Sequence, residues 1–357
     1  MLTAREHVGL ADYTTLRLGG PAAILAEATS EDELIDLVRD ADQAGRPLLV
    51  LGGGSNLVIA DAGFPGTVVR VATRGVTVAD SDGGDVVRLT VAAGENWDDF
   101  AEWSVAEKLA GIECLAGIPG LVGATPMQNV GAYGQEVASV IESVGVFNRR
   151  AGQVTRLPGA ECGFEYRTSR FKTEPGLYVV LDVTFTLRRD PMSVPIGYAE
   201  LARALGVALG DCAPLGEVRD AVLGLRRGKG MVLDSADPDT NSAGSFFTNP
   251  VLDPDQLARL ERLAASQSPG ATVPRYPAGP GLVKVPAAWL IEHAGFGKGY
   301  PGDGPARIST KHTLALTNRG GATTADVIAL ARQVVAGVRS AFEIDLAHEP
   351  VLVGVTL

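Results

Sequence analysis

The stretch at residues 111–135, GIECLAGIPGLVGATPMQNVGAYGQ, constrains the fold more than any other part of the chain. Six of its residues are glycine, and charge is almost absent from it. So many glycines disfavour a helix or strand interior, and the apolar character disfavours a disordered linker. The stretch therefore predicts a buried loop. By residue type it is equally typical of a tight turn in the core and of a loop whose backbone N–H groups bind the anionic part of a cofactor.

The length and charge of the chain limit the class of protein it can be. Its 357 residues suffice for two or three domains with a substantial core. Hydrophobic residues make up 46% of the chain and charged residues 20%, which is an ordinary globular balance. The formal net charge of −11 argues against a general nucleic-acid binder, because the phosphate backbone attracts basic proteins.

The positions of the cysteines and histidines favour neither a metal site nor a disulfide framework. The hydropathy pattern does not favour a membrane segment. Cys114, Cys162 and Cys212 lie far apart, and the four histidines are equally scattered. The N-terminal residues lack the apolar region of a signal peptide, and no run approaches the ~20 apolar residues of a membrane span. We expect an uncleaved cytoplasmic protein that binds no metal, membrane or nucleic acid.

A second glycine-rich loop, GGGSN at residues 52–56, lies between two predicted strands at 47–51 and 57–60. It does not match the dinucleotide-binding fingerprint, because the third glycine would fall at Leu57 and no helix follows. One interpretation is a β-turn between two strands. The other is a loop that binds a pyrophosphate through its N–H groups and its serine and asparagine side chains.

Periodicity predicts a first half made mostly of strands with few helices, which is typical of an α+β fold rather than of repeated βαβ units. Helical spacing predicts helices at 30–44, 97–109, 198–205, 215–227, 287–294 and 323–342. Apolar or alternating runs predict strands at 14–18, 144–149, 153–157, 178–187, 313–317 and 344–357, the last of them interrupted at 348–350. They also predict antiparallel strands over 67–94 with a hairpin tip at 81–85. In the first helix, Ser30 and Glu33 fit a capping box.

Basic residues gather at two places in this acidic chain. They are Arg167, Arg170 and Lys172 in the first group and Arg226, Arg227 and Lys229 in the second. Arginine suits a carboxylate or phosphate ligand, because its planar guanidinium donates two parallel hydrogen bonds. A solvated basic loop is the alternative for the first group, and interaction with a helix dipole is the alternative for the second.

Six motifs follow one another along the chain. They are LGGGSN at 51–56, GIPGLVGATPMQNVGAYG at 117–134, FEYRTSRFK at 164–172, NSAGSFFTNP at 241–250, AAWLIEHAGFGKG at 287–299 and HEPVLVG at 348–354. Together they resemble the UDP-N-acetylenolpyruvoylglucosamine reductase family, and the resemblance spans nearly the whole chain. No single motif is decisive, but six in this order are hard to obtain by chance.

The resemblance implies an α+β protein with an FAD-binding fold of the vanillyl-alcohol-oxidase (PCMH) type and a smaller α+β substrate domain. Residues 1–72 with 344–357 would form the first FAD-binding subdomain, 73–228 the second, and 229–343 the substrate-binding domain. Both glycine-rich loops would hold FAD, without a covalent link. The cofactor-binding residues would be Gly52, Gly53, Gly54, Ser55, Asn56, Gly117, Pro119, Gly123, Ala124, Gln128, Asn129, Gly131, Ala132 and Tyr133.

The resemblance also implies an activity, the reduction of UDP-N-acetylglucosamine enolpyruvate to UDP-N-acetylmuramate by NADPH during peptidoglycan synthesis. The protein would act as a monomer. Catalysis is assigned to Arg167, Ser245 and Glu349, and substrate binding to Tyr166, Tyr198, Arg226, Lys229 and Asn249. One position departs from the family pattern, because His293 stands where an amide is expected. We interpret His293 as a structural histidine.

These residue types suit the implied chemistry. Hydride delivery to the β-carbon pushes negative charge onto the substrate carboxylate, which Arg167 would stabilise while Glu349 orients it or handles a proton. Ser245 would protonate the α-carbon. The alternatives are another FAD-dependent oxidoreductase of the same fold and a non-catalytic protein that binds flavin or a nucleotide sugar. The first has no use for Arg167, Ser245, Lys229 and Glu349 together, and the presence of Arg167, Ser245 and Glu349 argues against the second.

Overall fold

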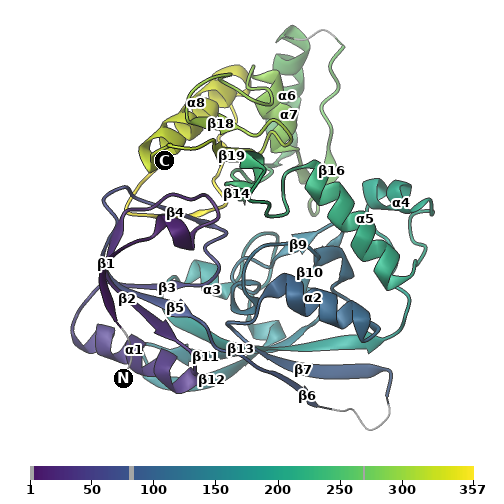
Figure 1. Cartoon of the computed structure of the whole chain (residues 1–357). Helices are drawn as coiled ribbons and strands as arrows, with labels where there is room; N and C mark the ends of the chain where they lie inside the picture. The colour runs from purple at the N-terminus through teal and green to yellow at the C-terminus, as the bar shows by residue number, and fades with distance from the viewer. Residues whose placement is uncertain (1–3, 80–83, 268–269) are drawn as a thin grey trace. The chain divides into compact units, whose positions relative to one another are not determined.

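The computed structural model describes residues 4–79, 84–267 and 270–357 (Figure 1). The chain divides into two compact units. The first unit comprises the N-terminal residues to Val8, Ala22–Gly54 and Phe64–Val232, and the second comprises Gly9–Pro21, Ser55–Gly63 and Leu233–Leu357. Each unit therefore combines segments that are distant in sequence. The division into three domains with the bounds given above stays a prediction.

One sheet of the first unit has the strand order β1-β2-β5-β3. Its strands are β1 (Arg5–Gly9), β2 (Pro21–Ala28), β5 (Phe64–Val71) and β3 (Leu48–Leu51). Strand β5 pairs in parallel with both β2 and β3, so the antiparallel arrangement predicted from residue 67 onward is wrong for this strand. Its consecutive residues Val68 and Val69 are both fully buried, as is typical of a parallel strand covered on both faces.

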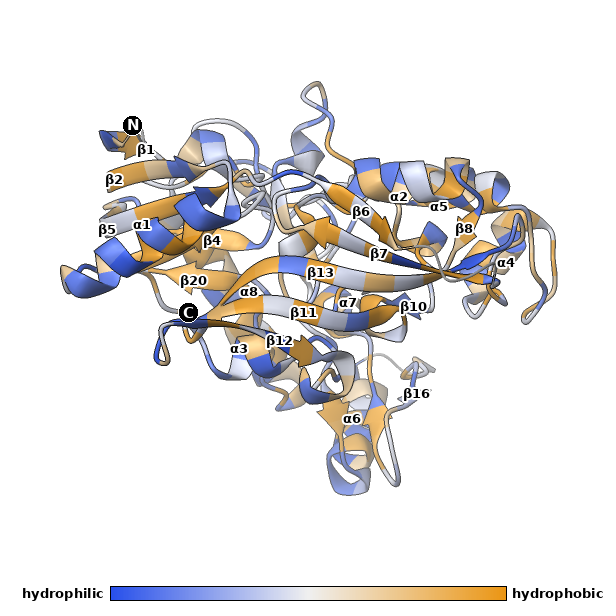
Figure 2. Ribbon diagram, turned by 90° about the horizontal axis from the view of Figure 1, so that it is seen from below, coloured by the Kyte–Doolittle hydropathy of each residue, from blue (hydrophilic) through white to orange (hydrophobic). Residues whose placement is uncertain are grey.

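Helix α1 (Glu31–Gln43) packs against this sheet through Leu34, Ile35 and Val38, and Figure 2 shows that its other residues are mostly hydrophilic. The predicted cap is confirmed at Ser30, whose hydroxyl accepts the N–H of Glu33 at 3.2 Å. The reciprocal bond differs from a capping box. The Glu33 carboxylate accepts from the N–H and the hydroxyl of Thr29, at 2.8 and 2.7 Å, instead of from Ser30.

The second sheet of the first unit is antiparallel and has the order β12-β11-β13-β7-β6, with β8 paired to β13. Its strands are β12 (Gln153–Pro158), β11 (Ile141–Asn148), β13 (Tyr178–Arg189), β7 (Val86–Ala92), β6 (Val76–Ala79) and β8 (Leu109–Ala110). The strands predicted at 144–149, 153–157 and 178–187 are confirmed. Strands β6 and β7 form the predicted hairpin, whose tip residues 81–83 lie outside the described part of the chain.

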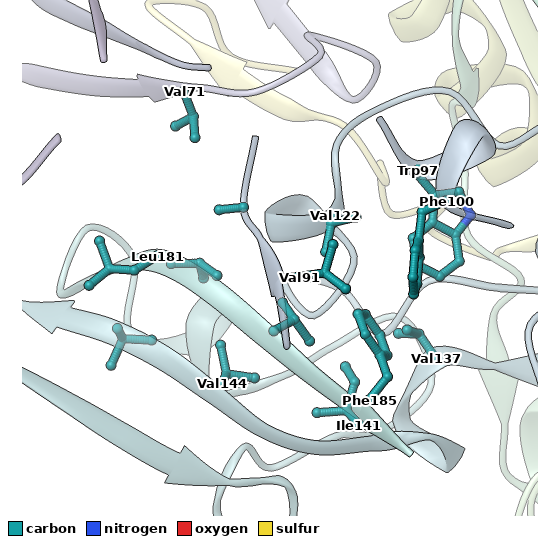
Figure 3. Packing of buried hydrophobic residues seen from close by; sticks show 14 of the residues in the cluster. Val71, Val91, Trp97, Phe100, Val122, Val137, Ile141, Val144, Leu181 and Phe185 are labelled. Carbon is teal, nitrogen blue, oxygen red and sulfur yellow. The ribbon is translucent and has the colours of Figure 1, made fainter. Parts of the chain in front are cut away.

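Helix α2 (Trp97–Ala106) covers this sheet and supplies aromatic side chains to the core (Figure 3). The ring centroids of Trp97 and Phe100 lie 6.1 and 5.3 Å from that of Phe185 in β13. The helix ends earlier than predicted, because Lys108 adopts a left-handed conformation with a φ of 58° and the chain continues into β8. This packing positions the glycine-rich stretch, which follows directly.

The remaining elements of the first unit lie within that stretch or follow it in the chain. The elements are η2 (Glu113–Leu115), η3 (Val122–Ala124), β9 (Gly131–Ala132), β10 (Gln135–Glu136), η4 (Val137–Ser139), η5 (Gly159–Glu161), α3 (Arg170–Thr173), α4 (Ala199–Leu205) and α5 (Leu215–Gly228). Residues 111–135 form a loop of turns with one short β9–β10 hairpin, as predicted. Helices α4 and α5 confirm the helices predicted at 198–205 and 215–227.

The described residues of the second unit form three small sheets and three α-helices. The strands are β4 (Leu57–Ile59) with β20 (Val351–Val353); β14 (Ser242–Ser245), β19 (Ala315–Asn318) and β18 (Ala306–Ile308); and β15 (Val251–Leu252), β17 (Val283–Lys284) and β16 (Tyr276–Pro277). The helices are α6 (Pro254–Gln267), α7 (Ala287–His293) and α8 (Thr324–Phe342), with the short turns η1 (Ala11–Tyr13) and η6 (Pro238–Thr240). Helix α8 confirms the helix predicted at 323–342, and Thr323 with Asp326 forms its capping box.

In the second unit one predicted strand is absent and one helix was missed. The strand predicted at 14–18 is a turn, because the Thr14 hydroxyl donates to the carbonyl of Leu18 at 2.8 Å and closes the chain on itself. Its apolar residues Leu16 and Leu18 are buried in the core of this unit, which explains the strand-like pattern. Helix α6 was not predicted. Among the described helices, none is both long and apolar enough to cross a bilayer.

Candidate active site

The two glycine-rich loops approach each other closely in the first unit. A Cβ atom on Gly53 would lie 2.8 Å from the Cα of Gly120, so neither loop has room for a side chain there. A Cβ atom on Gly123 would lie 2.5 Å from the Cβ of Ala93. The missing side chains let the two loop backbones pack directly against each other, and glycine-rich backbone of this kind suits the anionic part of a cofactor. The predicted cofactor residues Gly53 and Gly123 therefore share one structural reason for being glycine.

The far end of the second loop holds two strained residues. Asn129 and Tyr133 adopt left-handed conformations with φ of 47° and 48°. The Asn129 side chain is buried and donates to Glu136 Oε2 at 2.9 Å and to the carbonyl of Glu165 at 3.2 Å, while Oδ1 accepts the N–H of Ala138 at 3.1 Å. These hydrogen bonds fix the conformation of the loop. Left-handed non-glycine residues cost about 1–3 kcal/mol each and are concentrated at functional sites.

Arg167 lies against this loop. Its Nη2 donates to the carbonyl of Gly131 at 2.7 Å, and Nη1 lies 3.5 Å from the carbonyl of Asn129. Its own backbone is left-handed, with a φ of 55°, and its carbonyl accepts from Lys172 Nζ at 3.1 Å. The guanidinium thus has a fixed direction relative to the predicted cofactor residues of the loop.

Helix α5 adds two more cations to the same loop. Lys229 Nζ lies 5.5 Å from the ring centroid of Tyr133 and forms a 2.6 Å ion pair with Glu200. The Tyr133 ring makes an edge contact with the ring of Tyr198 at 5.5 Å. Arg226 Nη2 donates to the carbonyl of Met231 at 2.9 Å. The structure therefore brings together Tyr133, Tyr198 and Lys229, which the sequence assigned to ligand binding.

The electrostatics of this group reflect burial. Burial lowers the pKa of Arg226 to about 10, so the guanidinium stays charged at neutral pH, and its buried Nε has no hydrogen-bond partner in the protein. Burial also raises the pKa of Tyr133, against the opposing effect of Lys229 and Arg226. A partly buried cation with an unused N–H donor, in a chain of net charge −11, is suited to an anionic ligand.

In the second unit, Ser245 and Glu349 lie on adjoining segments. Ser245 ends strand β14, and the next residue, Phe246, donates its N–H to the carbonyl of Leu314 at 2.7 Å. The N–H of Glu349 donates in turn to the carbonyl of Phe246 at 2.9 Å. Phe246 is fully buried, so the backbone on both sides of Ser245 is fixed by core packing.

The other predicted residues of the second unit have local partners. Asn56 Nδ2 lies 3.5 Å from the carbonyl of Glu349, which links the end of the first glycine-rich loop to the segment of Glu349. Asn249 Oδ1 accepts the N–H of Ala287 at 2.9 Å, at the start of helix α7. The His293 ring stacks on that of Trp289 at 3.9 Å and bonds its carbonyl through Nδ1 at 2.8 Å, in agreement with the structural interpretation.

Two acidic residues at this site were missed in the sequence. Asp98 Oδ1 accepts the N–H of Gly117 at 2.7 Å, so this N–H is already used within the protein. The Glu113 carboxylate, wholly buried, accepts the N–H groups of Gly111 at 2.6 Å and of Val194 at 2.9 Å. Asp98 lies in the first turn of a helix, where acidic residues are common, and no pattern in the sequence distinguishes it.

Comparison with known proteins agrees with this architecture. Residues 237–353 match the family described as UDP-N-acetylenolpyruvoylglucosamine reductase, C-terminal domain, and residues 22–158 match the FAD binding domain family. The UDP-N-acetylenolpyruvoylglucosamine reductase of Thermobifida fusca is 60% identical over 99% of this chain and 98% of its own length. That of Streptomyces avermitilis is 58% identical over 98% of this chain and 94% of its own length.

The chain belongs to the UDP-N-acetylenolpyruvoylglucosamine reductase family. As a member of this family it is an FAD-dependent oxidoreductase of peptidoglycan precursor synthesis. The crystal structure of the enzyme from Thermus caldophilus superimposes with a TM-score of 0.66 at 27% identity, over 99% of this chain and 100% of that one. The predicted α+β class with an FAD-binding fold of the PCMH type is confirmed. The glycine-rich loops fit FAD, because Gly53 and Gly120 place backbone without side chains where the two loops meet.

Proposed function

We propose that this protein reduces UDP-N-acetylglucosamine enolpyruvate to UDP-N-acetylmuramate in the cytoplasm, with NADPH as the reductant. The observation that carries the proposal is the set of cations, Arg167, Arg226 and Lys229, gathered around a strained glycine-rich loop of an FAD-binding domain. A sugar nucleotide with a diphosphate and a carboxylate matches such a set. The names of the relatives agree with the same substrate. Bound FAD supplies the transfer of hydride from NADPH to the enolpyruvyl β-carbon.

Arg167 is proposed to stabilise the substrate carboxylate as negative charge develops on it. A guanidinium already held by the carbonyls of Gly131 and Asn129 needs little reorganisation when the charge appears. Glu349 is proposed to orient Arg167 or to help handle the proton of the substrate carboxylate. The hydrogen bond from its backbone N–H to the carbonyl of Phe246 fixes the position of the Glu349 backbone.

Ser245 is proposed to donate the proton that the α-carbon needs to complete the reduction. A serine hydroxyl is a weak acid, but a carbanion-like α-carbon is a strong base, so placement can suffice. The rigid backbone around Ser245 supports this role, because proton transfer requires the donor at hydrogen-bond distance.

The remaining assignments concern binding. We propose that Tyr166, Tyr198, Arg226, Lys229 and Asn249 contact the sugar nucleotide. The two glycine-rich loops would hold FAD without a covalent link, through Gly52–54, Ser55, Asn56 and residues between Gly117 and Tyr133. The three-domain division at 1–72 with 344–357, 73–228 and 229–343 belongs to the same proposal, as does a monomeric enzyme.

An anaerobic absorbance experiment tests the proposed function. The purified protein is examined alone, after NADPH, and after UDP-N-acetylglucosamine enolpyruvate. Bleaching of the flavin band by NADPH and its return with the sugar nucleotide are expected. Flavin that bleaches without reoxidation by this substrate would indicate another oxidoreductase of the same fold. Flavin that NADPH leaves unchanged would favour a binding protein.

A further inference from the structure

One carboxylate oxygen in the first unit joins the glycine-rich loop to helix α5. Asp98 Oδ1 accepts the N–H of Gly117 at 2.7 Å and lies 3.4 Å from Nη2 of Arg219. The same Nη2 lies 3.2 Å from Glu102, one turn further along α2. The Arg219 side chain is 11% exposed, and its buried Nε has no hydrogen-bond partner in the protein. This arginine is therefore more confined than the cation of an ordinary surface ion pair.

Helix α5, which carries Arg219, also approaches Gly117 through Leu223 and Arg226. Arg219 and Arg226 are two helical turns apart, so their side chains leave the same face. Arg226 Nε lies 3.4 Å from the point that a Cβ on Gly117 would occupy, and Leu223 and Val232 lie 2.7 and 3.1 Å from that point. Gly117 therefore contacts Asp98 of α2 and lies close to residues of α5. Helices α2 and α5 are neighbours in Figures 1 and 2.

The position of Asp98 is itself determined locally. The Asn96 side chain caps helix α2 by accepting the N–H groups of Asp98 at 2.9 Å and Asp99 at 3.1 Å. Both carboxylates lie in the first turn of the helix, so both interact favourably with its dipole. Only Asp98 also contacts Gly117 and Arg219. Asp98 therefore has contacts beyond the helix dipole that its exposed neighbour Asp99 lacks.

We propose that Asp98 and Arg219 are positioning residues that couple the FAD-binding loop to the cationic end of helix α5. This inference rests on the proposed function, because it takes Arg226 and Lys229 as groups that bind the anionic sugar nucleotide. Asp98 holds the loop at Gly117, and Arg219 holds α5 against α2 at the same oxygen. FAD binding and sugar-nucleotide binding are then linked, since each favours the same arrangement of loop and helix.

The test uses four single variants of the full chain: Asp98→Asn, Asp98→Ala, Arg219→Gln and the matched control Asp99→Asn. FAD affinity is measured by fluorescence titration of the apoprotein. Sugar-nucleotide affinity is measured in the FAD-bound protein, from the change in flavin absorbance on adding UDP-N-acetylglucosamine enolpyruvate. The unfolding temperature of each apoprotein is recorded as the measure of a merely structural effect.

The expected results separate the two contacts. Asp98→Ala removes the acceptor for the Gly117 N–H and weakens FAD binding about tenfold. Asp98→Asn keeps an acceptor but loses the charge, so FAD binding changes less than about twofold while sugar-nucleotide binding weakens about threefold. Arg219→Gln weakens sugar-nucleotide binding similarly, and the double variant Asp98→Asn/Arg219→Gln is no weaker than either single variant. Asp99→Asn changes neither affinity.

Several results would overturn the inference. They are additive losses in the double variant, equal effects of Asp98→Asn and Asp99→Asn, or unchanged FAD affinity in Asp98→Ala. Equal drops in unfolding temperature for Asp98→Asn and Asp98→Ala, with no separation of the two affinities, would reduce both residues to a structural role. Failure of the proposed function looks different: the wild-type protein would bind FAD without any spectral response to the sugar nucleotide. The FAD titrations would then still decide the part played by Asp98.

Discussion

Arg167 in the first unit and Ser245 in the second are held in different ways. Arg167 has a strained, left-handed backbone, and its charged group is directed by hydrogen bonds to the carbonyls of Gly131 and Asn129. Ser245 ends a regular strand, and buried apolar rings follow it directly. Hydrogen bonds to the guanidinium thus orient Arg167, whereas packing of the neighbouring backbone positions the hydroxyl of Ser245. Conservative substitutions should therefore affect the two sites differently.

The largest expected effect concerns Ser245. Ser245→Ala removes the proposed proton donor without disturbing the packing of Phe246, so the flavin-oxidising half-reaction should slow by about 10²–10⁴-fold. Reduction of the flavin by NADPH should stay near the wild-type rate. Stopped-flow absorbance measures both halves separately. Thr248→Val, in the same segment, is the control and should change neither, whereas an equal loss in both halves of Ser245→Ala would contradict a proton-donor role.

Arg167→Lys tests whether the hydrogen bonds that orient the guanidinium are needed. Lysine keeps the charge but cannot reproduce the two directed N–H bonds to the loop carbonyls, so flavin reoxidation by the sugar nucleotide should slow by about 10²–10³-fold. The same stopped-flow assay measures it. Arg170→Lys is the control, because Arg170 pairs with Glu174 instead. Near-normal reoxidation in Arg167→Lys would mean that charge alone suffices.

A third prediction concerns polar contacts inside the second unit. Burial by itself raises the pKa of the Asp239 carboxyl, but hydrogen bonds from Thr310 and Ser309 and the charge of Arg319 outweigh it and hold the pKa below its usual value. The Arg319 Nη1 atom lies 2.7 Å from Asp239 Oδ1. Asp239→Asn should lower the free energy of unfolding by about 3 kcal/mol at pH 7.

The sign of the pH dependence follows from the lowered pKa of Asp239. This stabilisation is present above the unfolded-state pKa of about 3.9 and is lost as the pH falls through the lower folded-state pKa. Urea unfolding at pH 7 and at pH 3 should therefore show a difference between wild type and Asp239→Asn that shrinks in acid. Asp345→Asn removes an exposed pair with Arg339 and should show almost no difference at either pH. A constant difference across pH would contradict the ion-pair explanation.

The smallest expected effects compare two glycines of the first unit. Gly53→Ala would place a methyl group 2.8 Å from the Cα of Gly120, so the loops must separate, and FAD affinity should fall by about tenfold or more. Gly224→Ala lies within helix α5, where no atom approaches a Cβ, and should raise the free energy of unfolding by up to about 1 kcal/mol. FAD titration and thermal unfolding measure the two. Unchanged FAD affinity in Gly53→Ala would show that the loop contact is not needed for the cofactor.

Prediction from the sequence succeeded where the signal is local. The apolar stripe and the Thr323 cap of α8 are contained within one segment, and the helix is confirmed. It failed where a local pattern has a distant cause. Leu16 and Leu18 alternate as in a strand, yet they are apolar because they enter the core of the second unit from a turn. The parallel pairing of β5 likewise depends on β2 and β3 rather than on its own residues.

At the candidate site, the motifs in the sequence identify the chemical groups and the family, because glycine-rich loops and arginines are visible as residue types in order. They do not reveal which groups are already used. The sequence predicts that the N–H of Gly117 donates to a cofactor. In the folded protein this N–H donates to Asp98, which lies 19 residues away in sequence. The direction of Arg167 is equally a property of the fold, since it depends on carbonyls 36 and 38 residues away. Residue types determined what this site can bind. Hydrogen bonds between distant segments decided which atoms are left to bind it.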